Sequence, residues 1–307
     1  MAIILSQYHH IHKESRFYTV HHEPVMINEV LTLIEAHPHT KILDGTLGLG
    51  GYSLAILEHF PESSVLGIDR DPQAISIALD RLKSYSERFS ALHSNFSDLQ
   101  SCKNYDAYIF DLGVSNMQLT IPERGFSFQN DGPLDMRMNP SGDSMTAAEL
   151  LQNSDADTLT RIFRDYGEER FARQIAQAIK HSRTPITTTG QLVDVIRSSL
   201  PQPVQRKMGT HPARRVFQAL RIYINDEAGE LERLLNLLPS LSAHALIIFA
   251  AYHSLEDRLI KHTFRQWQAD GKGKILTRHP LTPSEEEMSA NYKARSAKLR
   301  AFCINTD

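Results

Sequence analysis

An acidic residue leads directly into a glycine-rich stretch near the start of the chain. Asp44 opens the run Asp-Gly-Thr-Leu-Gly-Leu-Gly-Gly, which lies between an apolar segment at 41–43, typical of a strand, and a helical pattern at 52–59. Glycines at such a junction let the backbone turn tightly and let a ligand approach it closely. The run therefore predicts a loop that binds a nucleotide-like cofactor. Its predicted cofactor-binding residues are Asp44, Gly48, Gly50 and Gly51.

Two features of this loop distinguish between cofactors. Ser53 occupies the position of the last glycine in the dinucleotide-binding pattern G-x-G-x-x-G. The carboxylate of Asp44 would repel a pyrophosphate, but it would attract the ammonium and sulfonium groups of S-adenosylmethionine. Asp69 follows Gly51 by 18 residues, close to the spacing at which an acid binds ribose hydroxyls. We therefore expect S-adenosylmethionine, with a nicotinamide-dependent oxidoreductase as the alternative class of enzyme.

Strands and helices alternate around these residues. This alternation predicts an α/β fold with a mostly parallel, doubly wound sheet, which binds ligands at the carboxyl ends of its strands. The apolar run 245–250 is typical of a buried central strand, and we expect 299–304 to close an edge of the sheet. The other predicted strands are 41–43, 65–69, 89–93 and 105–110. The predicted helices around the sheet begin near Pro24, Tyr52 and Asp71, and two more span 213–238 and 255–267.

Helix signals replace this alternation after Gly113. Thr146 with Glu149, and Thr188 with Gln191, have the spacing of capping boxes, which start helices. We therefore expect an all-helical insert in the sheet domain. The expected division of the chain is a polar N-terminal tail at 1–21, a cofactor-binding domain at 22–118 and 213–307, and the inserted helical domain at 119–212.

Composition limits the classes of protein that fit. The 307 residues exceed the usual size of one domain, and 41% hydrophobic residues suffice for a packed core. The net charge of -3 excludes a protein that coats nucleic acid through bulk positive charge, so any such binding must be local. Cys102 and Cys303 lack the spacing of a disulfide framework or zinc site. No stretch has the pattern of a secretory signal peptide or a membrane-spanning helix. We expect a cytoplasmic protein with no metal and no membrane contact.

Several longer motifs carry a more specific signal than the loop. The first reads Asp-Leu-Gly-Val-Ser-Asn-Met-Gln, from Asp111 to Gln118. Further motifs lie at 123–128, 131–138, 166–171, 211–215, 253–258 and 294–296. Together they resemble the bacterial ribosomal RNA small subunit methyltransferase H family, from about His22 to near the C-terminus. The chain departs from that family's pattern at Tyr52, where many members have histidine, and at Asn116-Met117, where many have Ser-Pro.

The resemblance implies a fold, a reaction and a partner. It implies a Rossmann-like class I methyltransferase domain with an inserted all-helical domain that recognises RNA. The implied reaction transfers a methyl group from S-adenosylmethionine to the exocyclic N4 of a cytidine in the decoding region of 16S rRNA, within the small ribosomal subunit or its precursor. The oligomeric state is left open. The implied cofactor contacts are Gly50, Gly51, Tyr52, Asp69, Phe96, Asp111 and Gln118.

Asp111 is the main candidate for catalysis. The lone pair of a cytosine amine is delocalised into the ring, so an enzyme must align the amine with the methyl donor and accept a hydrogen bond from it. Asp111, at the carboxyl end of a predicted strand, fits that acceptor, a cofactor contact or a simple turn cap. Ser115 and Asn116 are secondary catalytic candidates.

Candidates for substrate binding lie in the insert and after the apolar strand. Phe126 and Phe128 are candidates for stacking on an extruded base, although packing in the insert is the simpler role. Ser254-x-x-Asp257 also has the spacing of a helix cap. The expected substrate-binding residues are Arg137, Arg214, Arg215, His253 and Ser254.

Other basic residues form local groups that can neutralise phosphates, although each is more often a solvated side chain on a helix. A non-catalytic RNA-binding factor for ribosome assembly, which keeps an old cofactor pocket, is therefore a further alternative. These basic residues are Arg161, Arg164, Arg170, Arg173, Arg206, Lys207 and Arg221, with a C-terminal group of Lys293, Arg295, Lys298 and Arg300.

Overall fold

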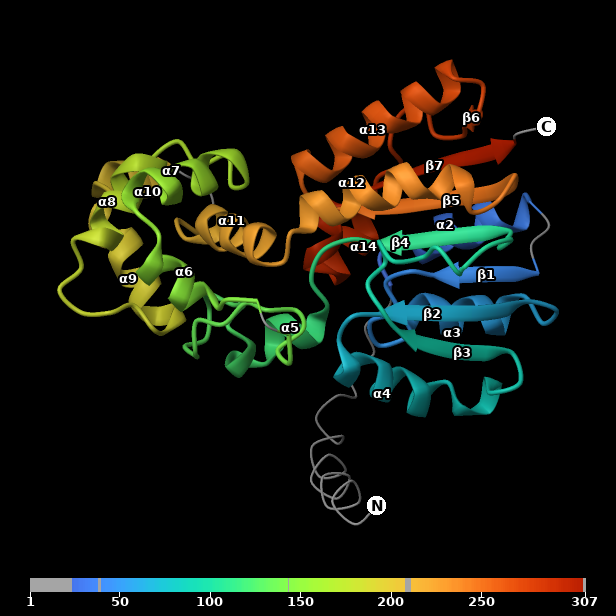
Figure 1. Cartoon of the computed structure of the whole chain (residues 1–307), viewed down its shortest axis with the longest axis horizontal. Coiled ribbons are helices and arrows are strands. Elements are labelled where there is room, and N and C mark those ends of the chain that lie inside the picture. The colour runs from blue at the N-terminus through green and yellow to red at the C-terminus, as the bar shows by residue number, and fades with distance from the viewer. Residues whose placement is uncertain (1–23, 38–39, 143, 208–210, 306–307) are drawn as a thin grey trace, which may run out of the picture.

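The computed structural model describes residues 24–305 except for 38–39, 143 and 208–210, and leaves the side chains of Asn116 and Lys207 undescribed. Two parts lie side by side in Figure 1, a sheet flanked by helices and a group of helices without a sheet. The expected N-terminal tail at 1–21 lies outside the described residues.

The sheet has seven strands in the order β3-β2-β1-β4-β5-β7-β6. The strands β1 to β5 pair in parallel, whereas β7 runs antiparallel between β5 and β6. This arrangement confirms the predicted α/β sheet. The strands are β1 (Lys41–Asp44), β2 (Ser64–Asp69), β3 (Phe89–His93), β4 (Ala107–Asp111), β5 (His244–Ala251), β6 (Gly273–Ile275) and β7 (Lys298–Asn305).

Helices cover both faces of the sheet, because successive side chains of a strand point to opposite faces. On β4, Ile109 packs in one core with Ile56, whereas Phe110 packs in the other with Phe264. The first face is covered by α2 (Ile27–Glu35), α3 (Gly51–His59) and α4 (Pro72–Arg81), and the second by α12 (Glu227–Leu237) and α13 (Ser254–Ala269). Shorter elements of this part are α14 (Glu285–Ala290), η2 (Lys83–Tyr85), η4 (Leu238–Ser240) and η5 (Tyr292–Ser296).

The second part is helical, as predicted, and follows β4 in the chain. Both predicted capping boxes are present, with Thr146 and Thr188 as N-cap residues. No helix among the described residues is long and apolar enough to cross a membrane. The elements of this part are α5 (Asn116–Thr120), η3 (Pro122–Arg124), α6 (Ala147–Asn153), α7 (Ala156–Asp165), α8 (Ala172–Lys180), α9 (Thr189–Ser199), α10 (Gln202–Lys207) and α11 (Arg214–Ile224).

The single helix predicted at 213–238 is wrong, because two helices occupy this stretch. Asp226 has a φ of 48° and separates α11 from α12. The side chain of Asn225 fixes the bend by accepting from the Met138 N–H at 2.8 Å and donating to the Met136 carbonyl at 2.8 Å. Since α11 contributes Phe217 to the core of the helical part, we propose that the insert extends beyond residue 212 to this bend.

Three smaller expectations are also corrected. The strand expected at 105–110 runs from Ala107 to Asp111, so Asp111 is its last residue. The strand expected at the sheet edge, now β7, lies inside the sheet because the short β6 pairs along its outer side. Helix α2 does not begin at Pro24 but at Ile27, after Met26 with a φ of 57°.

Candidate active site

The glycine-rich loop joins β1 to α3, and Asp44 fixes it through two hydrogen bonds. The buried carboxylate of Asp44 accepts hydrogen bonds from the Ser53 hydroxyl at 2.7 Å and from the Thr46 N–H at 3.3 Å. Burial raises the pKa of Asp44 to about 6, although both bonds oppose the rise. Ser53 therefore has a structural reason to replace the last glycine of the dinucleotide pattern, because its hydroxyl holds the acid of the loop.

Asp69 ties the end of β2 to the same loop. Its partly buried carboxylate accepts bonds from the N–H groups of Gly48 at 2.8 Å and of Asp71 at 2.9 Å. Burial raises the pKa of Asp69. Gly48 and Gly50 have φ angles of 51° and 77°, at which a side chain would be strained. The loop is thus a glycine cradle fixed by acids from two neighbouring strands.

Asp111 lies at the same edge, at the end of β4. Its backbone N–H donates to Thr46 Oγ1 in the loop at 2.6 Å, and the Tyr252 hydroxyl donates to Asp111 Oδ1 at 2.5 Å. Burial raises the pKa of Asp111 to about 7, against the lowering effects of the Tyr252 bond and the positive charge of Lys293. The backbone at Asp111 is therefore bonded directly to the glycine-rich loop, and its carboxyl group is bonded to Tyr252.

Tyr252 and Lys293 both influence Asp111 from distant parts of the chain, Tyr252 by a hydrogen bond and Lys293 by its charge. Tyr252 directly follows β5, and Lys293 belongs to η5, where its Nζ donates to the Val114 carbonyl at 2.9 Å. Burial lowers the pKa of Lys293 to about 8, although Asp111 opposes this shift. The sequence pattern did not single out Tyr252, but a polar aromatic residue directly after a buried apolar strand was the available signal.

Two further predicted cofactor residues present aromatic rings. Phe96 is partly exposed, and its ring meets Phe110 edge to face with centroids 6.3 Å apart. Tyr52 is buried, and its hydroxyl donates to the Val25 carbonyl. Of this pair, only Phe96 is partly exposed.

Ser115 and Gln118 are engaged with each other. The Ser115 hydroxyl accepts from the Gln118 N–H at 3.2 Å, and the Gln118 side-chain oxygen accepts from the Ser115 N–H at 3.0 Å. This capping box begins α5, and the spacing that predicted the other boxes was present here as well. The side chain of Asn116, the other secondary catalytic candidate, lies outside the described residues.

The acids of β1, β2 and β4 form a site suited to a cationic ligand. Raised carboxylate pKa values mean that the negative charges of Asp44, Asp69 and Asp111 lack full compensation, and a cation supplies it. S-adenosylmethionine carries two cationic groups, so the residues fit it. Next to Asp69, a cavity of about 300 Å³ is lined by Arg70, His93, Ser94, Asn95, Asp98 and Asn139, the last from the insert.

His253 begins α13 and faces Glu256. The His253 Nδ1 accepts from the Glu256 N–H at 3.4 Å, and its Nε2 lies 2.9 Å from a Glu256 oxygen. The cap is therefore His253 rather than Ser254, which lies exposed in the first turn. Glu227 completes a group with metal-ligand atoms within 4.8 Å of one another. Arg221, however, donates two bonds to Glu227, at 2.7 and 2.8 Å, so caps and ion pairs account for the cluster.

The arginines predicted to bind substrate differ in availability. Arg137 is held by two bonds to the Asp135 carboxylate, each of 2.8 Å. Arg214 and Arg215 are exposed at the start of α11, where Arg215 donates to the Glu168 carbonyl at 3.1 Å. Arg214 and Arg215 are therefore the better placed of the three to meet an external ligand.

The four basic residues of the C-terminal group, which we expected to face RNA, do not form one continuous surface. Lys293 is bonded to the Val114 carbonyl. Arg300 is buried and pairs with Asp257 at 2.7 Å, where Lys298 also pairs at 3.1 Å. Arg221 is likewise committed to its ion pair with Glu227. Tertiary packing thus turns these cations inward or pairs them.

Both phenylalanines considered for base stacking pack inside the helical part. Phe126 is buried in its core. Phe128 stacks on the ring of His211 with centroids 4.6 Å apart and meets Phe217 edge to face at 5.7 Å. The simpler role, packing in the insert, therefore fits both residues.

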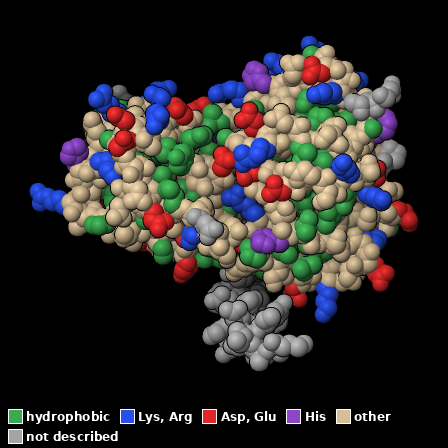
Figure 2. All heavy atoms as spheres, viewed as in Figure 1, with side chains coloured by type: hydrophobic (Ala, Val, Ile, Leu, Met, Phe, Trp, Pro, Cys, Tyr) green, Lys and Arg blue, Asp and Glu red, His purple; other side chains and the backbone are tan. Residues whose placement is uncertain are grey.

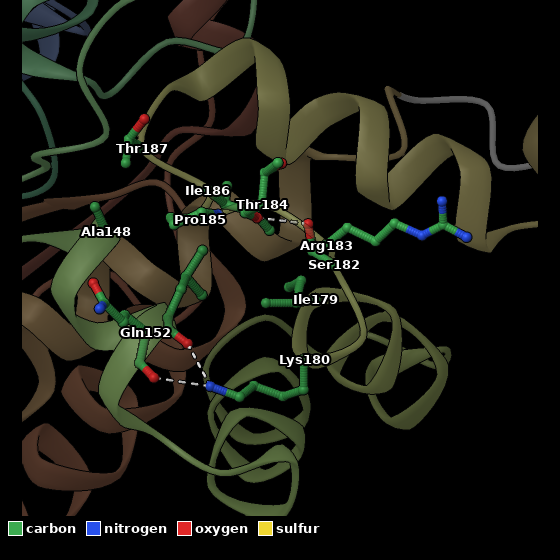
Figure 3. Close-up of a pocket in the computed structure, with 11 residues that line it drawn as sticks. Ala148, Gln152, Ile179, Lys180, Ser182, Arg183, Thr184, Pro185, Ile186 and Thr187 are labelled. Carbon is green, nitrogen blue, oxygen red and sulfur yellow. Dashed lines mark hydrogen bonds between the residues drawn. The ribbon is translucent and has the colours of Figure 1, made fainter.

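A second cavity, of about 310 Å³, lies in the helical part (Figure 3). Lys180 points its amine at the carbonyls of Leu151 and Gln152, with hydrogen bonds of 3.0 and 2.9 Å. Its ammonium group is therefore already bonded to the last turn of α6. Arg183 points away from the cavity in the same view. Figure 2 shows basic and acidic side chains mixed where the two parts of the molecule meet.

The fold and the acid-lined glycine loop define a Rossmann-like class I methyltransferase that uses S-adenosylmethionine. A model of the MraW methylase family matches residues 19–304. The chain therefore belongs to the MraW methylase family.

Relatives agree with this family. The ribosomal RNA small subunit methyltransferase H of Heliobacterium modesticaldum is 42% identical, over 92% of this chain and 97% of that one. The protein of the same name from a Cyanothece species is 46% identical, over 91% of this chain and 93% of that one. Among solved structures, the magnesium protoporphyrin IX methyltransferase of Synechocystis with bound S-adenosylmethionine aligns with a TM-score of 0.39 at 8% identity, over 91% and 78% of the two chains.

Proposed function

We propose that this protein methylates N4 of a cytidine in the decoding region of 16S rRNA. The observation that carries the proposal is Asp111 at the end of β4. Its backbone N–H bonds to Thr46 in the glycine-rich loop, and its buried carboxyl group has a pKa of about 7. The relatives named as ribosomal RNA small subunit methyltransferases support the choice of substrate.

In this proposal Asp111 accepts a hydrogen bond from the cytosine amine and aligns its lone pair. When bound, S-adenosylmethionine supplies an electrophilic methyl group on a sulfonium. As N4 bonds to the methyl carbon, the carbon–sulfur bond breaks, and Asp111 takes the proton that N4 loses. A carboxyl group with a pKa near 7 suits this role because it is ionised just above neutral pH and is still basic. Since Tyr252 bonds to Oδ1, we assign Oδ2 to the amine.

The helical insert is the proposed RNA-binding part. Arg214 and Arg215 are exposed there and can neutralise phosphates. A stacked cytosine must be extruded or already unpaired to reach a donor held in the glycine loop. We propose Asp44, Gly48, Gly50, Gly51, Tyr52, Asp69, Phe96 and Gln118 as the remaining residues that bind or shape the cofactor site.

Asp111→Asn tests the proposal because it removes the base and keeps the shape. With labelled S-adenosylmethionine and small subunits from cells that lack the protein, we expect a loss of about 100-fold or more in methyl transfer. Binding of S-adenosylmethionine, measured by calorimetry, shows whether the site is intact. Asp155→Asn is the control, because Asp155 caps α7 far from the sheet and asparagine caps equally well.

Mapping of modified cytidines tests the substrate. Small-subunit RNA from cells without the protein should lack one N4-methylated cytidine in the decoding region, and identical maps would defeat the assignment. An assembly factor without catalysis predicts instead that Asp111→Asn fully replaces the wild-type protein in cells. Free 16S rRNA, precursor particles and finished subunits, compared as substrates, identify the assembly stage.

A further inference from the structure

Lys293 lies in the site although it belongs to the C-terminal segment of the chain. Its Nζ donates to the Val114 carbonyl at 2.9 Å, in the loop that leads from Asp111 to α5. Val114 precedes Ser115, the residue that caps α5. One ammonium group therefore contacts the backbone between the candidate base and the first helix of the insert.

The neighbours of Lys293 do not share this arrangement. Arg295 lies over the ring of Tyr292 at 5.0 Å and donates to the Met288 carbonyl, and Lys298 pairs with Asp257. Of these three basic residues, only Lys293 is among the largest electrostatic influences on Asp111. Enclosing an ammonium group is unfavourable unless an opposite charge or hydrogen bonds compensate it, so its placement needs a compensating anion.

The Val114 carbonyl supplies a hydrogen bond to the amine, and the charge of Asp111 supplies the opposite sign nearby. Each group opposes the effect of burial on the other, since Lys293 favours the ionised carboxylate and Asp111 favours the charged amine. Arg221 of α11 acts on Lys293 in the opposite direction. The other groups that act on Asp111 are Tyr252, which donates a hydrogen bond, and the negatively charged Asp44 and Glu256. Lys293 thus supplies positive charge where the surrounding acids oppose ionisation.

We propose that Lys293 is a positioning residue for methyl transfer, which fixes the loop after β4 through Val114 and keeps Asp111 ionised to receive the amine hydrogen. This inference rests on the proposed role of Asp111. Lys293 itself need not touch either substrate.

The test compares Lys293→Met, which removes the charge, with Lys293→Arg, which keeps it, in pH profiles of kcat on small subunits. With Lys293→Met, Asp111 should ionise at higher pH, so the acidic limb of the profile moves upward. A shift of about one pH unit lowers kcat at pH 6 by about tenfold, and activity recovers toward pH 9. Lys293→Arg should return the limb toward its wild-type position. An acidic limb of Lys293→Met at the wild-type pH would overturn the inference.

Two further variants keep the test decisive. Lys298→Met is the matched control, because Arg300 still pairs with Asp257 when Lys298 is removed. Lys293→Gln can retain the bond to Val114 without the charge, and it replaces Lys293→Met if that variant does not fold. Asp111→Asn separates the two proposals. If it stays active, the role of Asp111 fails; if it is inactive while the uncharged Lys293 variants keep the wild-type profile, only this inference fails.

Discussion

At the residue scale, burial makes the ionisation of Asp44 sensitive to charges nearby. Its carboxylate has no exposure and two hydrogen bonds, and its pKa is about 6. The acid form is therefore favoured below pH 6, and a nearby cationic ligand favours the ionised form. In the proposed cofactor site, Asp44 therefore acts through its charge rather than through direct contact, because its carboxylate is fully buried.

Binding of S-adenosylmethionine should consequently strengthen as pH rises through about 6, because Asp44 becomes ionised in that range. Asp44→Asn should bind the cofactor about tenfold more weakly at pH 8 and should show a smaller pH dependence, since one ionising acid is lost. Calorimetric titrations from pH 5 to 8 measure both effects. Asp155→Asn serves again as the control, and equal pH dependence in Asp44→Asn and wild type would contradict this prediction.

At the scale of elements, short polar contacts join the sheet to the helical insert. Arg124 of η3 forms an ion pair with Asp71 at 2.7 Å and donates to the Met138 carbonyl at 2.8 Å. Asp71 also caps α4, two residues after Asp69. Arg70, between the two acids, donates to Asn225 at the end of α11. The acid proposed to hold the ribose is therefore followed at once by two residues bonded to the helical part.

Arg124→Met should destabilise the protein by about 3–5 kcal/mol, because it leaves the buried Asp71 without its cation. Chemical denaturation measures this loss. Arg164→Met is the matched control, since Arg164 pairs with Asp165 on an exposed helix surface, and we expect no measurable change there. If both variants had similar free energies of unfolding, the ion pair between Arg124 and Asp71 would not stabilise the contact between the two parts.

At the scale of the whole molecule, negative charge slightly exceeds positive charge. The chain has a net charge of -3, and several candidate cations are paired or enclosed. Arg214 and Arg215 remain exposed on the helical insert. RNA binding should therefore depend on a few local contacts and on the shape of the two parts together.

Reversing both charges, with Arg214→Glu and Arg215→Glu, should weaken binding to small-subunit RNA and lower the slope of log affinity against log salt by about two. Fluorescence anisotropy over a range of salt concentrations gives the slope. Arg265→Glu with Lys274→Glu changes the net charge equally, at exposed positions on α13 and β6, and should leave the slope unaltered. An unaltered slope in the first pair would exclude that surface.

The sequence by itself determined most of the sheet strands, the glycine-rich loop between β1 and α3, and the family motifs, because these depend on short-range patterns. Alternating apolar residues, glycines at a strand end and capping boxes act within a few residues, so β1 to β5 and the acids at their ends were predictable. The bend at Asn225 and the inner position of β7 were not, because both depend on partners far along the chain.

Only the tertiary structure decided which polar side chains meet. Asp111, Tyr252 and Lys293 are separated by long stretches of sequence. Folding bonds Tyr252 to Asp111, and it bonds Lys293 to Val114 in the loop that follows Asp111. The same folding removed Lys293 and Arg300 from a presumed basic surface and placed Ser115 and Gln118 in a cap. Charge in a sequence is only a count, whereas its effect depends on burial and on the partner that the fold supplies.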